Sequence, residues 1–100
     1  MLYAILTEDV ANSASKRKTA RAAHMKRMSE MQDAGRLIIS GPCLATDNPD
    51  PVSAGFRGSI IIAEFESLEA ARSWADADSY VAGGVWSKVT VRPFHKGFPR

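Results

Sequence analysis

Two histidines, a single cysteine and several aspartates are the side chains of this sequence that could carry acid–base or nucleophilic chemistry. Ala20, His24 and Met28 recur every four residues, so on a helix the imidazole of His24 would share the apolar face and point inward. An imidazole titrates near neutral pH and acts as a general acid or base when a partner, usually a carboxylate, fixes its tautomer. The alternative is a histidine that only packs in the core.

The carboxylate partner that His24 would need could be any of Asp33, Asp47, Asp50, Asp76 and Asp78. Asp33 follows nine residues later on the same helix, a rise of roughly 13 Å that excludes a hydrogen bond. Asp76 lies inside a second predicted helix and is expected to face solvent. Asp78 follows the end of that helix and is the preferred partner, although it could equally be a loop-capping residue. Tyr80, close by, could donate a hydrogen bond to a ligand or simply seal the core.

The other reactive side chains give weaker signals. Cys43 follows Gly41-Pro42 with no base nearby in sequence, so its thiol is expected to pack and not to react. His95 lies in a basic C-terminal segment and is expected on the surface. The spacing of the cysteine and the histidines matches no zinc site and no disulfide framework, so the sequence predicts neither a metal nor another cofactor.

A run of basic residues lies near the start of the first predicted helix. Lys16-Arg17-Lys18 is followed at helical spacing by Arg21, Lys26 and Arg27. A surface for nucleic acid or other anions is one interpretation, and a solvated helix face is the other. The formal net charge of the whole chain is only +2. So small a surplus indicates no nucleic-acid partner.

Alternation and helical periodicity place these side chains on a βαββαβ chain. Strands are expected at residues 2–7, 37–39, 59–65 and 85–92, with helices over 15–34 and from residue 68 after the cap Ser67. Gly41-Pro42 is expected to end the second strand, because proline has no N–H. Residues 45–58 are expected to form a long, mobile loop. This order of elements commonly folds as an α+β protein in which both helices cover one face of a four-stranded antiparallel sheet.

Length and composition indicate one folded domain over residues 1–100. The chain has 100 residues, of which 45% are hydrophobic and 24% are charged, as in ordinary globular domains. No apolar run reaches the roughly 18 residues that span a bilayer, and the N-terminus lacks the basic start of a signal peptide. A cytoplasmic protein without a membrane partner is therefore expected.

The uncovered face of the predicted sheet must carry apolar side chains. Ile60, Ile61 and Ile62 are consecutive, and side chains alternate along a strand, so either Ile61 or its two neighbours lie on that face. A second subunit is expected to cover it, sheet against sheet. RNA-binding domains share this topology, but where they stack two aromatic rings on bases this chain has Ser59 and Ile61. RNA binding is therefore not expected.

Several short segments, spread over nearly the whole chain, together resemble the YciI-like (YCII-related) proteins. They are Arg21-Ala22-Ala23-His24, Gly35-Arg36-Leu37, Gly41-Pro42, Gly55-Phe56-Arg57-Gly58-Ser59, Glu64-Phe65-Glu66-Ser67-Leu68-Glu69-Ala70-Ala71, Trp74-Ala75-Asp76-Ala77-Asp78 and Val91-Arg92-Pro93-Phe94. The resemblance implies a ferredoxin-like fold that dimerises as an α+β barrel, and a proposed site built around a histidine–aspartate pair. His24 and Asp78 match that pair. The family's Asp-Pro-Tyr segment reads Asp78-Ser79-Tyr80 here, which could loosen how Asp78 is aimed.

The resemblance also implies a class of chemistry, although it brings no settled substrate. Similar proteins include a dehydrochlorinase of a chlorinated hydroxyhydroquinone, and the wider superfamily holds muconolactone isomerases and small monooxygenases. We therefore expect His24, held by Asp78, to move a proton on a small cyclic or aromatic molecule without a cofactor, in a proton transfer, elimination or isomerisation. Arg21, Ser59 and Tyr80 are the expected ligand contacts. The alternative is a dimeric module that binds a small molecule without turning it over.

Overall fold

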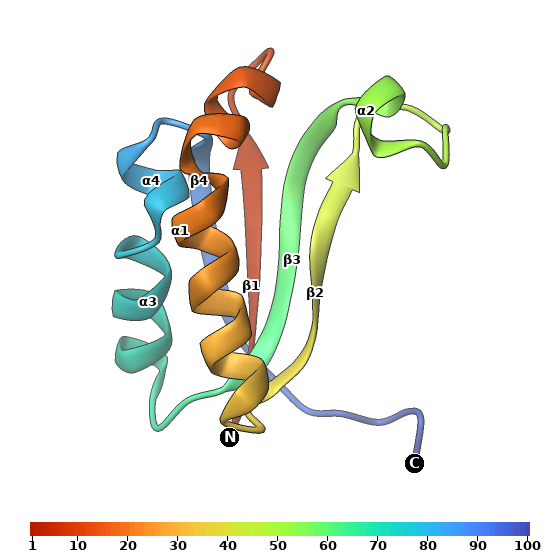
Figure 1. Cartoon of the computed structure of the whole chain (residues 1–100). Helices are drawn as coiled ribbons and strands as arrows, with labels where there is room; N and C mark the ends of the chain where they lie inside the picture. Colours follow the sequence, from red (N-terminus) through yellow and green to blue (C-terminus); the bar gives the residue numbers. More distant parts are fainter.

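The four strands of the protein form one antiparallel sheet, and its long helices pack on one face of that sheet (Figure 1). The computed structural model describes residues 1–100. Its elements are β1 (Leu2–Asp9), α1 (Ala14–Asp33), β2 (Leu37–Leu44), α2 (Pro51–Ala54), β3 (Phe56–Glu64), α3 (Leu68–Asp76), α4 (Ser79–Ala82) and β4 (Trp86–Phe94). The strand order is β2-β3-β1-β4, and every neighbouring pair is antiparallel. This is the ferredoxin-like α+β arrangement that the sequence predicted.

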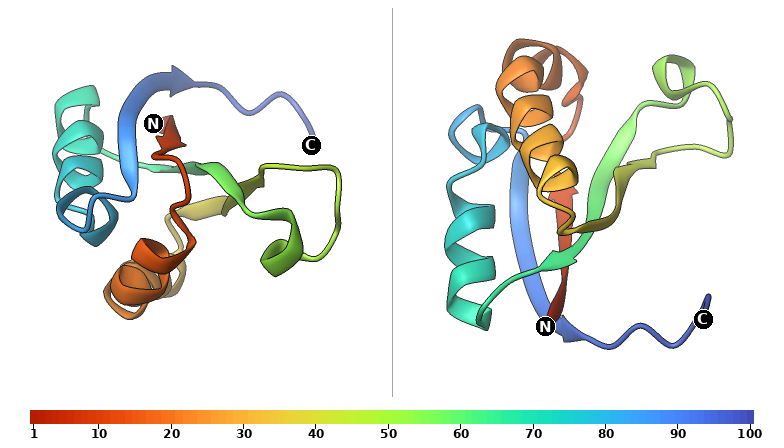
Figure 2. Two further views of the ribbon diagram at one scale, coloured as in Figure 1. Left: turned by 90° about the horizontal axis from the view of Figure 1, so that it is seen from above. Right: turned by 60° about the horizontal axis from the view of Figure 1, so that its bottom comes forward.

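The helices start and stop where their local sequence allows. α1 buries His24, Met28 and Met31 along one stripe, and it is followed by Gly35 with φ +70°, a conformation that glycine adopts without steric cost. The side chain of Ser67 caps α3 by accepting the backbone N–H of Ala70 at 3.0 Å, as predicted. Two further views show α1 beside α3 and α4 on the same side of the sheet (Figure 2). None of these helices combines the length and the apolar character that crossing a membrane requires.

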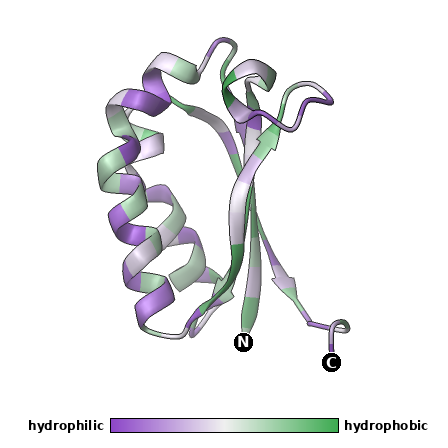
Figure 3. Ribbon diagram, turned by 45° about the vertical axis from the view of Figure 1, so that its right-hand side comes forward, coloured by the Kyte–Doolittle hydropathy of each residue, from purple (hydrophilic) through white to green (hydrophobic).

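The pairing register decides which side chains meet the helices. Ile5 lies opposite Ile61 and Thr7 lies opposite Ser59, and all four side chains are buried on the helix-facing side. Ile60 and Ile62 therefore face the other side of the sheet, which is the second of the two arrangements that the sequence allowed. Figure 3 shows the long helices along one side of the sheet and none of them along the other. The comparison with RNA-binding domains had placed Ser59 and Ile61 on the open face. That placement was wrong, because the register turns both toward α1.

Two expectations about the second strand and the following loop were wrong. β2 runs through Gly41 and Pro42 to Leu44. A proline is tolerated there because β2 is an edge strand, and the side of the proline that lacks an N–H can face away from the sheet. The expected loop is also shorter than 45–58. It contains α2, capped by Asp50, whose side chain accepts the N–H of Val52 at 3.3 Å, and β3 already begins at Phe56.

Gly58 lets β3 and β1 approach closely where they face the first turn of α1. A Cβ at this position would lie 1.9 Å from the carbonyl oxygen of Thr7, so no larger residue fits without moving the backbone. The close approach places the Gly58 carbonyl and the adjacent Ser59 side chain beneath α1.

Candidate active site

His24 and Asp78 meet in the protein interior between α1 and the start of α4. The Nδ1 atom of His24 lies 2.9 Å from Oδ1 and 3.0 Å from Oδ2 of Asp78. The residue His24 is 9% exposed, and the side chain of Asp78 is 0% exposed. Asp76, the rejected alternative on α3, is half-exposed and pairs with Arg72 at 3.5 Å. The residue preferred from sequence is thus the one that contacts the histidine.

Asp78 also organises the chain around it. Its Oδ1 accepts the backbone N–H of Tyr80 at 2.9 Å, which makes it the N-cap of α4, and its Oδ2 accepts Nη1 of Arg27 at 2.9 Å. The two readings of Asp78, helix cap and partner of the histidine, are therefore both correct. α4 itself was not predicted, because four residues are too few to show a helical pattern.

Ser79, which stands where the resembling family has proline, makes a hydrogen bond of its own. Its hydroxyl donates to the backbone carbonyl of Ala20 at 3.0 Å. This bond ties α4 to α1 one turn before His24. The side chain of Asp78 is thereby aimed at the imidazole without help from a rigid proline ring.

The environment of Asp78 keeps its carboxylate charged. Burial alone would raise the pKa of this carboxyl, but hydrogen bonds from His24 and from the Tyr80 N–H, with the positive charges of His24 and Arg27, together hold the pKa below its usual value. A charged carboxylate accepts the proton of Nδ1 and favours the tautomer in which Nε2 is free to act as a base. The hydrogen is assigned to Nδ1 of His24 because this hydrogen-bond network requires a donor there.

Aromatic rings fix the plane of the imidazole. The Tyr80 ring stacks on that of His24 with centroids 4.0 Å apart and planes 8° from parallel. Trp86 meets both rings edge-on, at 5.8 Å from His24 and 5.6 Å from Tyr80. Burial, the largest influence, raises the pKa of the Tyr80 phenol; the charges of Arg17 and Arg21 oppose that rise and Asp78 adds to it. The phenol therefore stays protonated at neutral pH and can donate a hydrogen bond.

A pocket of about 500 Å³ opens beside His24, between α1 and the strands β2 and β3. This volume is within the range of small-molecule sites. Its walls are Arg17, Arg21, His24, Met25, Met28, Ser40, Gly41, Pro42, Pro51, Val52, Phe56, Ser59, Ile61 and Tyr80. All three expected ligand contacts, Arg21, Ser59 and Tyr80, are among them. Asp78 does not line the pocket and acts from behind His24, so the nitrogen left for a ligand is Nε2.

Two arginines of the basic run, Arg17 and Arg27, match neither interpretation of that run, a surface for anions or a solvated helix face. Arg17 is 7% exposed and reaches across to the sheet, so it belongs neither to a solvated face nor to a surface patch. Arg27 is bound to Asp78, and its Nη2 donates to the carbonyl of Trp74 at 2.6 Å. The signal that could have identified Arg17 is its spacing of seven residues from His24, which puts both on one helix stripe.

The remaining candidates from the sequence lie away from this pocket. Cys43 is half-buried on β2, where it pairs with Gly58, and His95 is exposed beyond β4. No group of three or more His, Cys, Asp and Glu side chains is placed to hold a metal ion.

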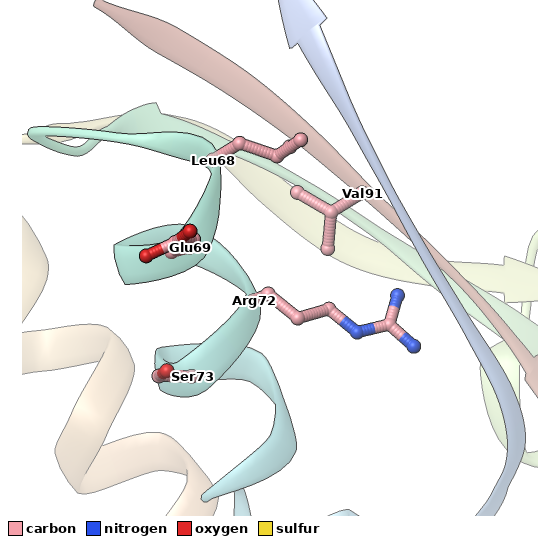
Figure 4. A pocket seen from close by; sticks show the side chains of 5 residues that line it. All are labelled: Leu68, Glu69, Arg72, Ser73 and Val91. Carbon is pink, nitrogen blue, oxygen red and sulfur yellow. The ribbon is translucent and has the colours of Figure 1, made fainter.

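A second hollow, of about 460 Å³, lies between α3 and β4 and shares no residue with the first (Figure 4). Its walls are Leu68, Glu69, Arg72, Ser73 and Val91. Arg72 crosses it and donates to the carbonyl of Val89 at 2.9 Å. It contains no histidine and no cysteine, so the pocket beside His24 is the better candidate for chemistry.

The lowered pKa of Asp78 predicts how stability depends on pH. A carboxyl whose pKa is lower in the folded than in the unfolded protein stabilises the fold fully above its unfolded value, ~3.9, and less as pH falls through the folded value. We expect the free energy of unfolding to decrease below about pH 4. In Asp78→Asn this decrease should be shallower, whereas Asp76→Asn should retain the wild-type slope. Urea unfolding measured between pH 2 and pH 7 tests this, and identical slopes in all three proteins would contradict it.

Comparisons with known proteins agree with this architecture. The family model of the YCII-related domain matches residues 1–95. Protein YciI of Escherichia coli O6:H1 is 55% identical over 98 residues, which cover 98% of this chain and all of that protein. An uncharacterized protein of Haemophilus influenzae is 44% identical over the same share of both chains. A solved structure, 5-chloro-2-hydroxyhydroquinone dehydrochlorinase from Burkholderia phenoliruptrix AC1100 in complex with 2,5-dihydroxybenzoquinone, superposes with a TM-score of 0.86 at 24% identity, covering 97% of this chain and 96% of the other.

Proposed function

The chain belongs to the YCII-related domain family, and on this premise we propose that it is a cofactor-free enzyme in which His24 moves a proton on a small cyclic or aromatic molecule. The observation that carries the proposal is the buried hydrogen bond between His24 and Asp78 at the wall of a pocket. In the reaction, Nε2 takes a proton from the substrate or returns one, as in an elimination or an isomerisation. Asp78 holds the tautomer and stabilises the imidazolium that forms.

The size and lining of the pocket support a single-ring substrate. Its volume of about 500 Å³ would surround one small ring, and its walls combine apolar side chains with a few polar ones. The solved neighbour acts on a chlorinated hydroxyhydroquinone and was obtained with a dihydroxybenzoquinone. That similarity supports phenolic rings as the first substrates to test.

The three expected ligand contacts receive distinct roles. Arg21, one turn before His24, attracts a negatively charged oxygen of the substrate toward the pocket. The hydroxyl of Ser59 and the protonated phenol of Tyr80 donate hydrogen bonds to substrate oxygens. No aspartate or glutamate lines the pocket, so an anionic ring meets no repulsion inside it.

The experiment that tests the proposal is a turnover screen of chlorinated hydroquinones, phenols and lactones with the wild-type protein. Chloride release, isomerised product or exchange of a ring proton with deuterated water would each report proton chemistry. A screen in which no ring compound is altered, although some bind, would contradict an enzymatic role. That result would favour the alternative function, a module that binds a small molecule, which is compatible with Asp78 serving mainly as the cap of α4.

We also propose that this single domain forms a homodimer through the uncovered face of the sheet. Leu6, Ile39, Ile60 and Phe94 are all exposed there, with Ile39 at 61%. An apolar face of this kind is unusual on a soluble monomer.

Sedimentation equilibrium is expected to give twice the chain mass of 10.9 kDa. Ile60→Lys should halve the measured mass, because it places a charge in the middle of that face. Leu68→Lys, which places the same charge at an exposed apolar position on α3, should not alter the measured mass. A wild-type protein that sediments as a monomer would refute the dimer.

A further inference from the structure

We propose that Arg17, together with Ser59, forms an anion subsite in the pocket beside His24, and that it selects rings bearing a negatively charged oxygen remote from the reacting atom. The inference rests on the proposed function only in placing the ligand in the same pocket. Arg17 is nearly buried, lines that pocket and carries a positive charge into it. Its role goes beyond the contacts assigned to Arg21, Ser59 and Tyr80.

The hydrogen bonds of Arg17 to Asp9, Gly58 and Ser59 use only two of its three guanidinium nitrogens. Nε and Nη2 donate to the carboxylate of Asp9 at 2.7 and 2.9 Å. Nη2 also donates to the carbonyl of Gly58 and to Oγ of Ser59, each at 3.0 Å. None of these bonds uses Nη1. The guanidinium also interacts with the phenol of Tyr80, another wall of the pocket. A guanidinium held this rigidly at a pocket wall, with Nη1 outside the Asp9 contact, is well suited to bind a carboxylate or phenolate oxygen.

Ser59 extends the same subsite. Its oxygen accepts from Arg17, so its hydroxyl hydrogen is available to a ligand. Ser59 is buried and lines the pocket, which places a neutral donor beside the charged one. An anionic oxygen could therefore receive hydrogen bonds from both residues.

Arg17 and His24 both lie beside the Tyr80 ring. The Cζ atom of Arg17 is 5.1 Å from the centre of the Tyr80 ring, and the centre of the His24 ring is 4.0 Å from that same point. Guanidinium and imidazole are therefore at most 9.1 Å apart, the sum of these distances. A six-membered ring in the pocket is therefore long enough to contact both groups, with one edge at Nε2 of His24 and an oxygen of another edge at Arg17. The Phe56 ring, 4.6 Å from the same Cζ atom, closes this end of the pocket.

Charge balance explains why a buried arginine can remain charged without a ligand. Asp9, whose side chain is 1% exposed, neutralises Arg17. Arg21 forms no ion pair, and no carboxylate lines the pocket, so the pocket as a whole stays positive. Asp9 thus positions Arg17, whereas Arg17 contacts the anionic oxygen of the ligand.

The test compares two probes of equal shape and different charge, benzoate and benzamide, titrated into the full-length protein and followed by NMR. The wild type should bind benzoate about tenfold more tightly, a difference of about 1.4 kcal/mol. The double variant Asp9→Asn with Arg17→Met leaves no unpaired charge behind, and in it the preference should fall below about twofold. Arg21→Gln should lower the preference less, because the exposed Arg21 is screened by solvent. A double variant that still prefers benzoate tenfold would overturn the inference.

Asp9→Asn alone provides a check that does not depend on how well the double variant folds. Asparagine can still accept a hydrogen bond from Arg17, but it no longer neutralises the guanidinium. Benzoate should therefore bind more tightly than to the wild type, by about threefold. Unchanged or weaker binding would overturn the inference. These results are independent of turnover: a protein that prefers benzoate but alters no substrate supports this subsite and contradicts the enzymatic proposal.

Discussion

The His24→Gln variant is expected to lose ~10²–10⁴-fold in kcat on any ring substrate that the wild type converts. Glutamine can occupy the site and donate its amide N–H to Asp78, so the buried network around Arg27 and Tyr80 need not collapse. What it lacks is an imidazole nitrogen that can accept and release a proton. Because the ligand contacts remain, KM should change far less than kcat, and steady-state kinetics measures both.

The matched control for this prediction is His95→Gln, because His95 is exposed and outside the pocket. It should leave kcat unchanged. Thermal unfolding of both variants establishes that they are folded. A His24→Gln protein that is folded and retains wild-type kcat would remove His24 from the chemistry, whatever its distance from Asp78.

The parts of the fold and of the site that follow from local patterns could be predicted from the sequence. The stripe of His24, Met28 and Met31 sets the inner face of α1, and the alternation in residues 2–7 sets the inner and outer faces of β1. The preference for Asp78 required only that the chain turn beside α1 after α3. In each case the pattern extends over several residues or depends on distance along one helix, so tertiary contacts did not need to be known.

Features that depend on pairing between distant segments could not be predicted. Pro42 would end a strand that has a neighbour on each side, because one ladder would lack its N–H, but at the sheet edge the side without an N–H can face away from the sheet, and the strand order sets that position. Arg17 and Arg27 look like surface residues in a basic run, because their carboxylates lie on other elements: Asp9 at the end of β1, eight residues before Arg17, and Asp78 at the start of α4. Only the packing of α1 on the sheet and on α4 turns these charges inward.

The opposite charges around Asp78 explain why this carboxylate can be fully buried. A lone carboxylate in the interior would be neutralised by a raised pKa, since water stabilises its charge far better than apolar side chains do. Here Arg27 supplies a permanent positive charge at 2.9 Å, and His24 supplies one only when protonated. The Tyr80 N–H and Arg27 therefore favour the ionised form of Asp78 in both states of the imidazole. In the proposed reaction, the histidine would exchange its proton with a substrate without passing it to Asp78.

Asp78→Asn should accordingly weaken both the fold and the proposed catalysis. Removing one partner of a buried pair costs about 3–5 kcal/mol, and the low end applies here because Arg27, at 20% exposed, can still reach water. The kcat on any ring substrate that the wild type converts should also fall, since the imidazolium formed in the proposed reaction loses the negative charge that stabilises it. Urea unfolding at pH 7 measures the first effect, and steady-state kinetics measures the second.

The double variant Asp78→Asn with Arg27→Met separates the two effects. Replacing both charges leaves no unpaired guanidinium, so part of the lost free energy of unfolding should return relative to Asp78→Asn alone. The kcat should stay low in comparison with the wild type, because the carboxylate is still missing. A folded Asp78→Asn protein with the wild-type kcat would show that the carboxylate does not act on His24. The 2.9 Å contact would then serve only to hold α4 against α1.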